Sequence, residues 1–73
     1  MNLYFFSPSC GPCKRITPKV DLAIKAGIPI RKVNVAEETG RYLAAVFGVN
    51  ATPAYVEFGT TKVLTGLEVW QEF

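Results

Sequence analysis

The sequence contains no histidine and only two cysteines among its 73 residues. Because zinc usually takes about four nitrogen or sulfur ligands, a zinc site here would need two chains that share their cysteine pairs. No apolar run approaches the ~18 residues that a membrane-spanning helix requires. The net charge is only +2 and the basic residues are spread along the chain. We therefore expect no metal, no nucleic acid and no membrane partner.

The length and composition predict one domain that spans residues 1–73. The hydrophobic fraction of 49% is enough for a compact core. The start of the sequence, Met1 to Phe6, shows neither a basic leader nor a cleavage site, so we expect a cytoplasmic monomer without a secretory signal. Cytosolic cysteines stay reduced unless they cycle, which favours a catalytic role for this pair.

Both cysteines lie in the stretch Ser7–Pro8–Ser9–Cys10–Gly11–Pro12–Cys13, between an apolar run and a helical pattern. Two thiols at this separation can close into a small disulfide ring and reopen with little other movement. At a helix start, unpaired backbone N–H groups and the positive end of the helix dipole lower the pKa of a thiol. We predict that Cys10 attacks a substrate disulfide and that Cys13, one turn later, releases the mixed disulfide.

Two other interpretations of the cysteine pair stay open at this point. The pair could be half of a zinc site that two chains share. It could also form a purely structural disulfide, although so small a ring constrains little of the unfolded chain and would stabilise the fold weakly. Thiol–disulfide exchange is the hypothesis that we carry forward.

Hydrophobic periodicity predicts an α/β protein with the order βαβαββα. The expected strands cover residues 1–6, 28–35, 54–58 and 62–65, with a hairpin turn at 59–61, and the expected helices cover 11–26, 37–47 and 67–73. The first strand is predicted to be buried on both faces, in the middle of a sheet. Arg31 and Lys32 interrupt the second strand, which favours an edge position. A right-handed βαβ unit then places the cysteines at the carboxyl end of the first strand.

The apolar residues predict which face each helix buries. We expect buried faces of Ile16, Val20, Ala23 and Ile24 in the first helix, Leu43, Val46 and Phe47 in the second, and Leu67, Trp70 and Phe73 in the third. A lone tryptophan such as Trp70 is more often core than a binding platform. Glycines at 27 and 48 are predicted to end helices.

Three residues should modify the helices locally. Pro18 lies inside the first helix and is predicted to kink its axis. Gly40 should loosen the first turn of the second helix, in which Glu37 and Glu38 suit the helix dipole. Glu37 can also pair with Arg41 one turn later.

The element order, with a CxxC motif opening the first helix, resembles the thioredoxin family. Cys10–Gly11–Pro12–Cys13 is similar to the family's active-site tetrapeptide, and Pro18 matches the proline of its kinked helix. Independently of the cysteines, Phe47–Gly48–Val49–Asn50–Ala51–Thr52–Pro53 looks like the segment that leads to the family's cis-proline. The resemblance extends from about Leu3 to Leu67. It implies a minimal thioredoxin fold, with a four-stranded mixed sheet flanked by three helices.

The same resemblance implies a substrate site. On sequence alone the Thr52–Pro53 bond is expected to be trans, but the resemblance implies a cis bond that brings Thr52 beside the disulfide. The Thr52 backbone could then pair with an extended substrate strand. The substrate-binding residues that the resemblance implies are Gly11, Pro12, Thr52, Pro53 and Gly66.

The sequence also departs from the family pattern. It has no counterpart of the N-terminal strand and helix of thioredoxin, so its size resembles that of a glutaredoxin. Ser9 replaces the tryptophan that usually precedes the motif, and Trp70 cannot replace it by position. Tyr4 replaces a buried aspartate that is thought to deprotonate the resolving thiol. Water, the leaving thiolate of Cys10 or the Tyr4 hydroxyl could then take the proton from Cys13.

The resemblance implies a thiol–disulfide oxidoreductase that reduces protein disulfides and needs no cofactor beyond a reversible Cys10–Cys13 disulfide. Its reductant would be a thioredoxin reductase or glutathione, and ribonucleotide reductase is a candidate client. Glutathione-dependent glutaredoxins carry paired glycines followed by acidic residues, whereas this chain offers only Gly66–Leu67–Glu68. We therefore favour thioredoxin-type chemistry over a glutaredoxin. A redox-silent binding module is the remaining alternative, which the presence of both cysteines disfavours.

Overall fold

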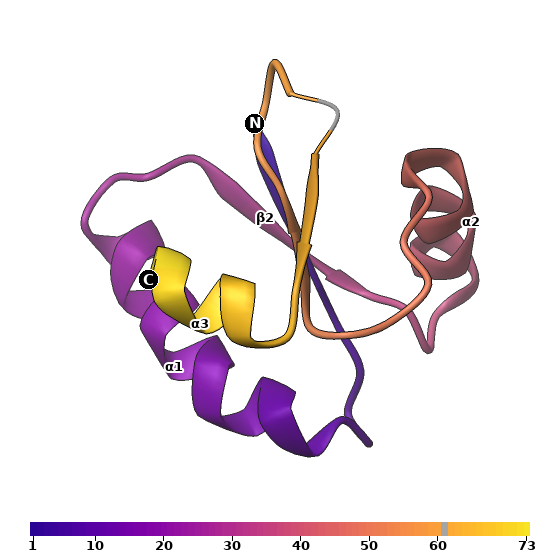
Figure 1. The fold of residues 1–73 in the computed structure, drawn as a ribbon, viewed down its shortest axis with the longest axis horizontal. Coiled ribbons are helices and arrows are strands. Elements are labelled where there is room, and N and C mark those ends of the chain that lie inside the picture. The colour runs from indigo at the N-terminus through magenta and orange to yellow at the C-terminus, as the bar shows by residue number, and fades with distance from the viewer. Residues whose placement is uncertain (61) are drawn as a thin grey trace.

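The computed structural model describes residues 1–60 and 62–73. Its elements are β1 (Asn2–Phe6), α1 (Gly11–Lys25), β2 (Ile30–Asn34), α2 (Glu38–Phe47), β3 (Ala54–Val56), β4 (Val63–Thr65) and α3 (Leu67–Glu72), as Figure 1 shows. The predicted βαβαββα order is confirmed. The predicted hairpin strands are longer than β3 and β4, and Thr61 of the predicted turn lies outside the described residues. No helix in the described ranges is long and apolar enough to cross a membrane.

The four strands form one mixed sheet in the order β2-β1-β3-β4. Strand β1 pairs in parallel with β2 and antiparallel with β3, which in turn pairs antiparallel with β4. The predicted central place of β1 and edge place of β2 are both confirmed. Because β1 is central, both of its faces are covered, and the consecutive side chains of Tyr4 and Phe5 are both fully buried.

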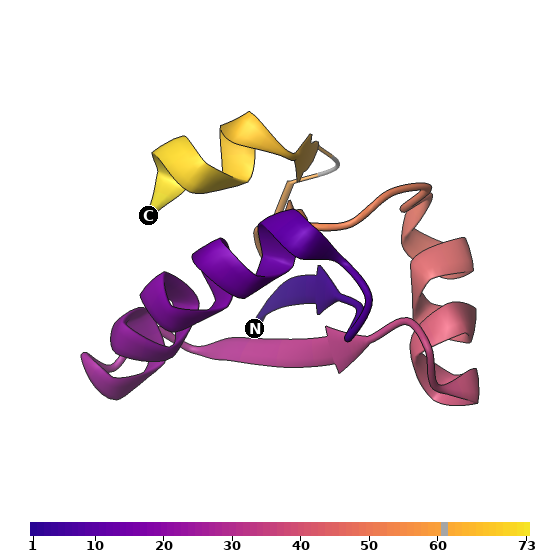
Figure 2. The ribbon, with the colours of Figure 1, turned by 90° about the horizontal axis from the view of Figure 1, so that it is seen from below.

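Each face of the sheet carries its own hydrophobic core. Under α1 and α3, the buried residues are Tyr4, Ile16, Val20, Ile30, Tyr55 and Val69. Under α2, they are Phe5, Val33, Ala44, Val49, Ala54 and Val56. Figures 1 and 2 show the same division, with α1 and α3 near each other and α2 apart from them. Side chains alternate between the faces of a strand, so the neighbours Tyr4 and Phe5 belong to different cores.

The predicted face of α1 is confirmed. Ile16 and Val20 are buried, and Ala23 and Ile24 pack against the same core. Pro18 lies inside α1, which continues past it to Lys25. The helix ends before Gly27, whose φ of +103° is readily adopted by glycine.

The buried face of α2 differs from the prediction. Leu43 packs against the core as predicted, but Val46 and Phe47 are 58% and 41% exposed, and the buried residues of the helix are Gly40 and Ala44. A methyl group at Gly40 would overlap the carbonyl oxygen of Asn34, so only glycine allows the helix to approach the end of β2 this closely. Gly40 is thus a packing residue, and its loosening of the first turn stays a prediction.

The first turn of α2 also differs in its ion pairing. Glu37 precedes the helix as its N-cap. In the described part of the chain, Arg41 does not pair with Glu37. Its Nη1 instead donates a hydrogen bond to the carbonyl oxygen of Ala36 over 2.8 Å. The Arg41 guanidinium therefore binds the backbone of the segment that precedes α2.

The prediction that Trp70 belongs to the core is wrong. Helix α3 buries Val69 completely, while Leu67 and Trp70 are 69% and 43% exposed. Phe73 packs edge-on against Tyr55, with ring centroids 4.9 Å apart. At the start of α3, the carboxylate of Glu68 accepts a hydrogen bond from the backbone N–H of Thr65 over 3.2 Å. Val69 packs in the core under α1 and α3, and Trp70 contacts Lys19 of α1.

Candidate active site

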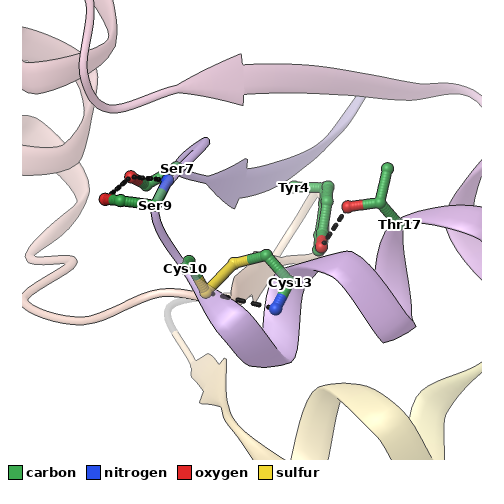
Figure 3. The surroundings of a disulfide bond; sticks show 6 residues. All are labelled: Tyr4, Ser7, Ser9, Cys10, Cys13 and Thr17. Carbon is green, nitrogen blue, oxygen red and sulfur yellow. Dashed lines mark hydrogen bonds between the residues drawn. A yellow bond between two sulfur atoms is a disulfide. The ribbon is translucent and has the colours of Figure 1, made fainter.

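Cys10 and Cys13 form a disulfide at the start of α1, with their Cα atoms 5.2 Å apart (Figure 3). The short ring forms because Cys10 is the extended N-cap residue and Cys13 lies in the first helical turn. Each sulfur is bonded to the other, whereas the zinc interpretation requires both as thiolates. Within residues 1–60 and 62–73, no three acidic, cysteine or histidine side chains gather to hold a metal.

The sulfur of Cys10 occupies the place that a serine or aspartate oxygen takes at a helix N-cap. Its Sγ accepts a hydrogen bond from the backbone N–H of Cys13 over 3.2 Å. Pro12 has no N–H to offer, and the N–H of Cys10 itself donates to the carbonyl oxygen of Ser7 over 3.1 Å. The 15-residue helix also directs the positive end of its dipole at this sulfur. Both effects favour a negative charge on the Cys10 sulfur once the disulfide is reduced.

The two sulfurs differ in their access to solvent. The side chain of Cys13 is only 2% exposed, while that of Cys10 is half-buried. Nucleophilic exchange requires a direct approach to the attacking sulfur, so the more open Cys10 suits the attacking role and the enclosed Cys13 the resolving role. Lys14 and Arg15 follow on the exposed side of α1.

The turn before β3 lies at the same end of the sheet as the disulfide. The register pairs Phe5 with Ala54, which places Pro53 level with the carboxyl end of β1, where the chain leaves toward Cys10. The Thr52–Pro53 peptide bond is cis, as the resemblance implied. The N–H of Gly66 donates to the carbonyl oxygen of Pro53 over 3.2 Å. Three of the predicted substrate residues, Thr52, Pro53 and Gly66, therefore lie together.

The other two predicted substrate residues, Gly11 and Pro12, are exposed between the cysteines. Thr52 is half-buried, whereas the side chain of Pro53 is fully buried. A substrate could therefore reach the backbone of Thr52 while Pro53 holds the turn from inside.

Tyr4 lies on the inner side of α1, and its hydroxyl points toward Thr17 rather than into solvent (Figure 3). The two hydroxyl oxygens are 2.9 Å apart. Burial raises the pKa of Tyr4 above its ordinary value of about 10, more than the hydrogen bond to Thr17 lowers it. The phenol therefore stays protonated at neutral pH and cannot be the base for Cys13. Water and the thiolate that leaves when Cys10 attacks remain as acceptors of this proton.

A groove of about 400 Å³ lies between α1 and α3. Its lining residues are Pro12, Arg15, Ile16, Gly66, Leu67 and Trp70. The sequence interpretation missed Arg15, Leu67 and Trp70 as candidates. The only available signal was the helical spacing of residues 67–73, and that spacing pointed to the core.

Comparison with known proteins identifies the relatives of this chain. The thioredoxin family model matches residues 1–67. The crystal structure of Chlamydomonas reinhardtii thioredoxin f2 superposes with a TM-score of 0.75 at 20% identity, over 97% of this chain and 69% of that one. The structure of Fasciola hepatica thioredoxin superposes with a TM-score of 0.75 at 28% identity, over 97% of this chain and 71% of that one. A mutant of a thioredoxin-like protein gives 0.71 at 18% identity, over 99% and 93%. No curated protein sequence matches significantly.

Proposed function

This chain belongs to the thioredoxin family, and we propose that it reduces disulfide bonds in client proteins with Cys10 as the attacking thiolate. The cysteine pair of a thioredoxin-family domain makes the chain a thiol–disulfide oxidoreductase. The observation that carries the finer proposal is the hydrogen bond from the Cys13 N–H to a half-buried Cys10 sulfur at 3.2 Å. That contact supports an accessible thiolate at neutral pH.

The reaction has two displacement steps. The Cys10 thiolate attacks one sulfur of the client disulfide, which forms a Cys10–client disulfide and expels the other client sulfur as a thiolate. That thiolate, or water, then takes the proton of Cys13, and the Cys13 thiolate attacks the Cys10 sulfur. The Cys10–Cys13 disulfide forms, the second client thiolate leaves, and two electrons have passed to the client.

The client would lie against the cis-proline turn. We propose that an extended client segment pairs with the backbone of Thr52 and crosses Gly11 and Pro12, while Pro53 and Gly66 hold the turn. The hydrogen bond between Gly66 and Pro53 supports this arrangement, because it fixes the turn independently of any client. No cofactor is needed beyond the cysteine pair.

We propose a thioredoxin reductase rather than glutathione as the reductant. The Gly11–Pro12 dipeptide is thioredoxin-like, and the carboxylate of Glu68 is already engaged with the N–H of Thr65 at the start of α3. That carboxylate is therefore less available for the amino group of glutathione. A monomer that works in a reducing compartment such as the cytoplasm, with ribonucleotide reductase among its clients, fits this scheme.

The test is turnover of a protein disulfide such as that of insulin. We expect robust reduction with NADPH and a thioredoxin reductase, and slow reduction with glutathione and glutathione reductase. The Cys10→Ser variant should lose turnover, and Cys13→Ser should accumulate a mixed disulfide through Cys10. Activity that depends on glutathione alone would make the chain a glutaredoxin. Function that survives Cys10→Ser would make it a docking module.

A further inference from the structure

The groove between α1 and α3 begins at the reacting disulfide. Pro12 stands between the two cysteines and forms one wall, while Gly66 forms another. Gly66 is hydrogen-bonded to Pro53, so this wall continues into the cis-proline turn. A polypeptide whose cystine reaches Cys10 would therefore pass this groove with the residues next to its own cysteine.

The groove exposes apolar surface that is held in place. Leu67 and Trp70 are 69% and 43% exposed along it, whereas Val69 of the same helix is fully buried in the core. The ammonium of Lys19 lies 3.8 Å from the centroid of the Trp70 ring and donates to the Trp70 carbonyl oxygen over 3.2 Å. A cation over an indole ring restrains the ring, so the Trp70 side chain loses little further entropy when a ligand packs on it. Trp70 thereby supplies an aromatic surface near the CxxC motif, where Ser9 replaces the tryptophan that usually precedes that motif.

Two cations border the groove, because Arg15 lines it and the ammonium of Lys19 lies against the Trp70 ring. Lys14 and Arg15 lie near the N-terminus of α1, whose first turn has no acidic residue. The helix dipole opposes cations at this end, so these two charges do not serve to stabilise α1. Asp21 is paired with Lys32 over 2.8 Å, and Glu68 accepts a hydrogen bond from the Thr65 N–H. A carboxylate beside Arg15 would meet the positive charges of Arg15 and Lys19.

We propose that this groove binds the client segment next to the reacting cystine and selects segments that carry an apolar and an acidic side chain there. The apolar side chain packs on Trp70 and Leu67, and the carboxylate pairs with Arg15. The inference rests on the proposed function, because the segment is presented only when the client cystine reaches Cys10. It adds the chemical class of client that this chain prefers.

The first test compares cystine peptides that differ only beside the cysteine, carrying Leu and Glu, Leu and Lys, or two glycines. We expect the reduced protein to exchange with the Leu–Glu peptide about fivefold faster than with the Leu–Lys peptide, the scale of one exposed ion pair. Salt of about 1 M should shrink that ratio. Arg15→Gln should bring the ratio close to one, whereas Arg31→Gln, a matched charge removal on the edge strand β2, should leave it unchanged.

The outcomes separate the two proposals. Equal rates for the Leu–Glu and Leu–Lys peptides in the unsubstituted protein would overturn the groove proposal and leave protein disulfide reduction standing. No exchange with any of the three peptides would overturn the proposed function itself. A ratio that falls equally in Arg15→Gln and Arg31→Gln would also overturn the groove proposal, because the preference would then follow net charge.

The second test uses Trp70, the only tryptophan of the chain. In Cys13→Ser protein linked through Cys10 to the Leu–Glu peptide, Trp70 emission should shift to shorter wavelength and acrylamide quenching should fall. The adduct with the glycine-flanked peptide is the control. Emission that is identical in the two adducts would overturn the proposal. Emission that changes with protein concentration without peptide would do the same, because a second copy of the chain would then occupy the groove.

Discussion

The hydroxyl oxygen of Tyr4 lies 2.9 Å from Oγ1 of Thr17 and joins the central strand to α1 one turn after Cys13. This pair stands where a thioredoxin would place its buried aspartate. Because burial raises the pKa of Tyr4, the contact is a neutral hydrogen bond that holds the helix on the sheet. We expect it to hold the active-site helix in position and to take no part in proton transfer.

The first prediction concerns this hydrogen bond. Tyr4→Phe should lower the free energy of unfolding by about 1 kcal/mol, because it leaves the Thr17 hydroxyl without its partner. In a domain of this size the midpoint of thermal unfolding should fall by about 4–8 °C. The rate of disulfide exchange and its pH profile should not change. A displaced pH profile would show that the phenol does transfer protons.

The second prediction concerns alkaline stability. Burial is the largest cause of the raised pKa values of Tyr4 and Tyr55. The folded state then holds these protons more tightly than the unfolded state, so the stabilisation is complete below about pH 10, the unfolded value, and is lost as the pH rises through the folded values.

Denaturant unfolding at about pH 8 and about pH 11 measures this loss. Tyr4→Phe and Tyr55→Phe should each make the alkaline loss smaller. Tyr42→Phe, which removes an exposed hydroxyl, is the control for loss of a phenol as such. A loss of equal size in the unsubstituted protein and in both buried-tyrosine variants would contradict the assignment.

The third prediction concerns the contact between α2 and the end of β2. Gly40→Ala should destabilise the protein by about 1–3 kcal/mol through overpacking against the Asn34 carbonyl. Helix propensity alone predicts the opposite sign, a gain of about 1 kcal/mol. Gly11→Ala is the matched control, since a methyl group there meets nothing within 4 Å. Equal stability changes in the two variants would refute the close contact.

The fourth prediction separates core from surface in α3. Val69→Ala should lower the free energy of unfolding by about 2 kcal/mol, because the side chain is fully buried and its truncation leaves a cavity. Leu67→Ala removes more apolar volume but should change the stability by less than about 0.5 kcal/mol, since Leu67 is 69% exposed. Denaturant unfolding of both variants decides the matter. A larger loss of stability in Leu67→Ala than in Val69→Ala would contradict this, because Leu67 would then belong to the buried face that the sequence pattern predicted.

The disulfide and its place at a helix start could be predicted from the sequence because their determinants are local. The spacing of Cys10 and Cys13 and the helix that starts between them lie within a few residues, and the family resemblance indicated the cis bond before Pro53. The buried faces of α2 and α3 could not be predicted in this way. Gly40 faces the core through its small size and gives no hydrophobic signal.

Helix α3 shows a second limit of sequence patterns. It has only six residues, and fewer than two turns give too short a period to orient a helix. Its contacts from Glu68 to Thr65 and from Lys19 to Trp70 join polar groups, which hydrophobic periodicity does not take into account. The groove beside the disulfide follows from the orientation of α3, so it emerged only from the structure.

The central claim is that the start of α1 holds Cys10 as a thiolate. Alkylation by iodoacetamide across pH tests it most directly in the reduced Cys13→Ser variant, where Cys10 is the only thiol. We predict a rate midpoint clearly below the value near 8.5 of a free cysteine, and a return to that value when the same protein is unfolded in denaturant. The same midpoint near 8.5 in the folded and the unfolded protein would contradict the account.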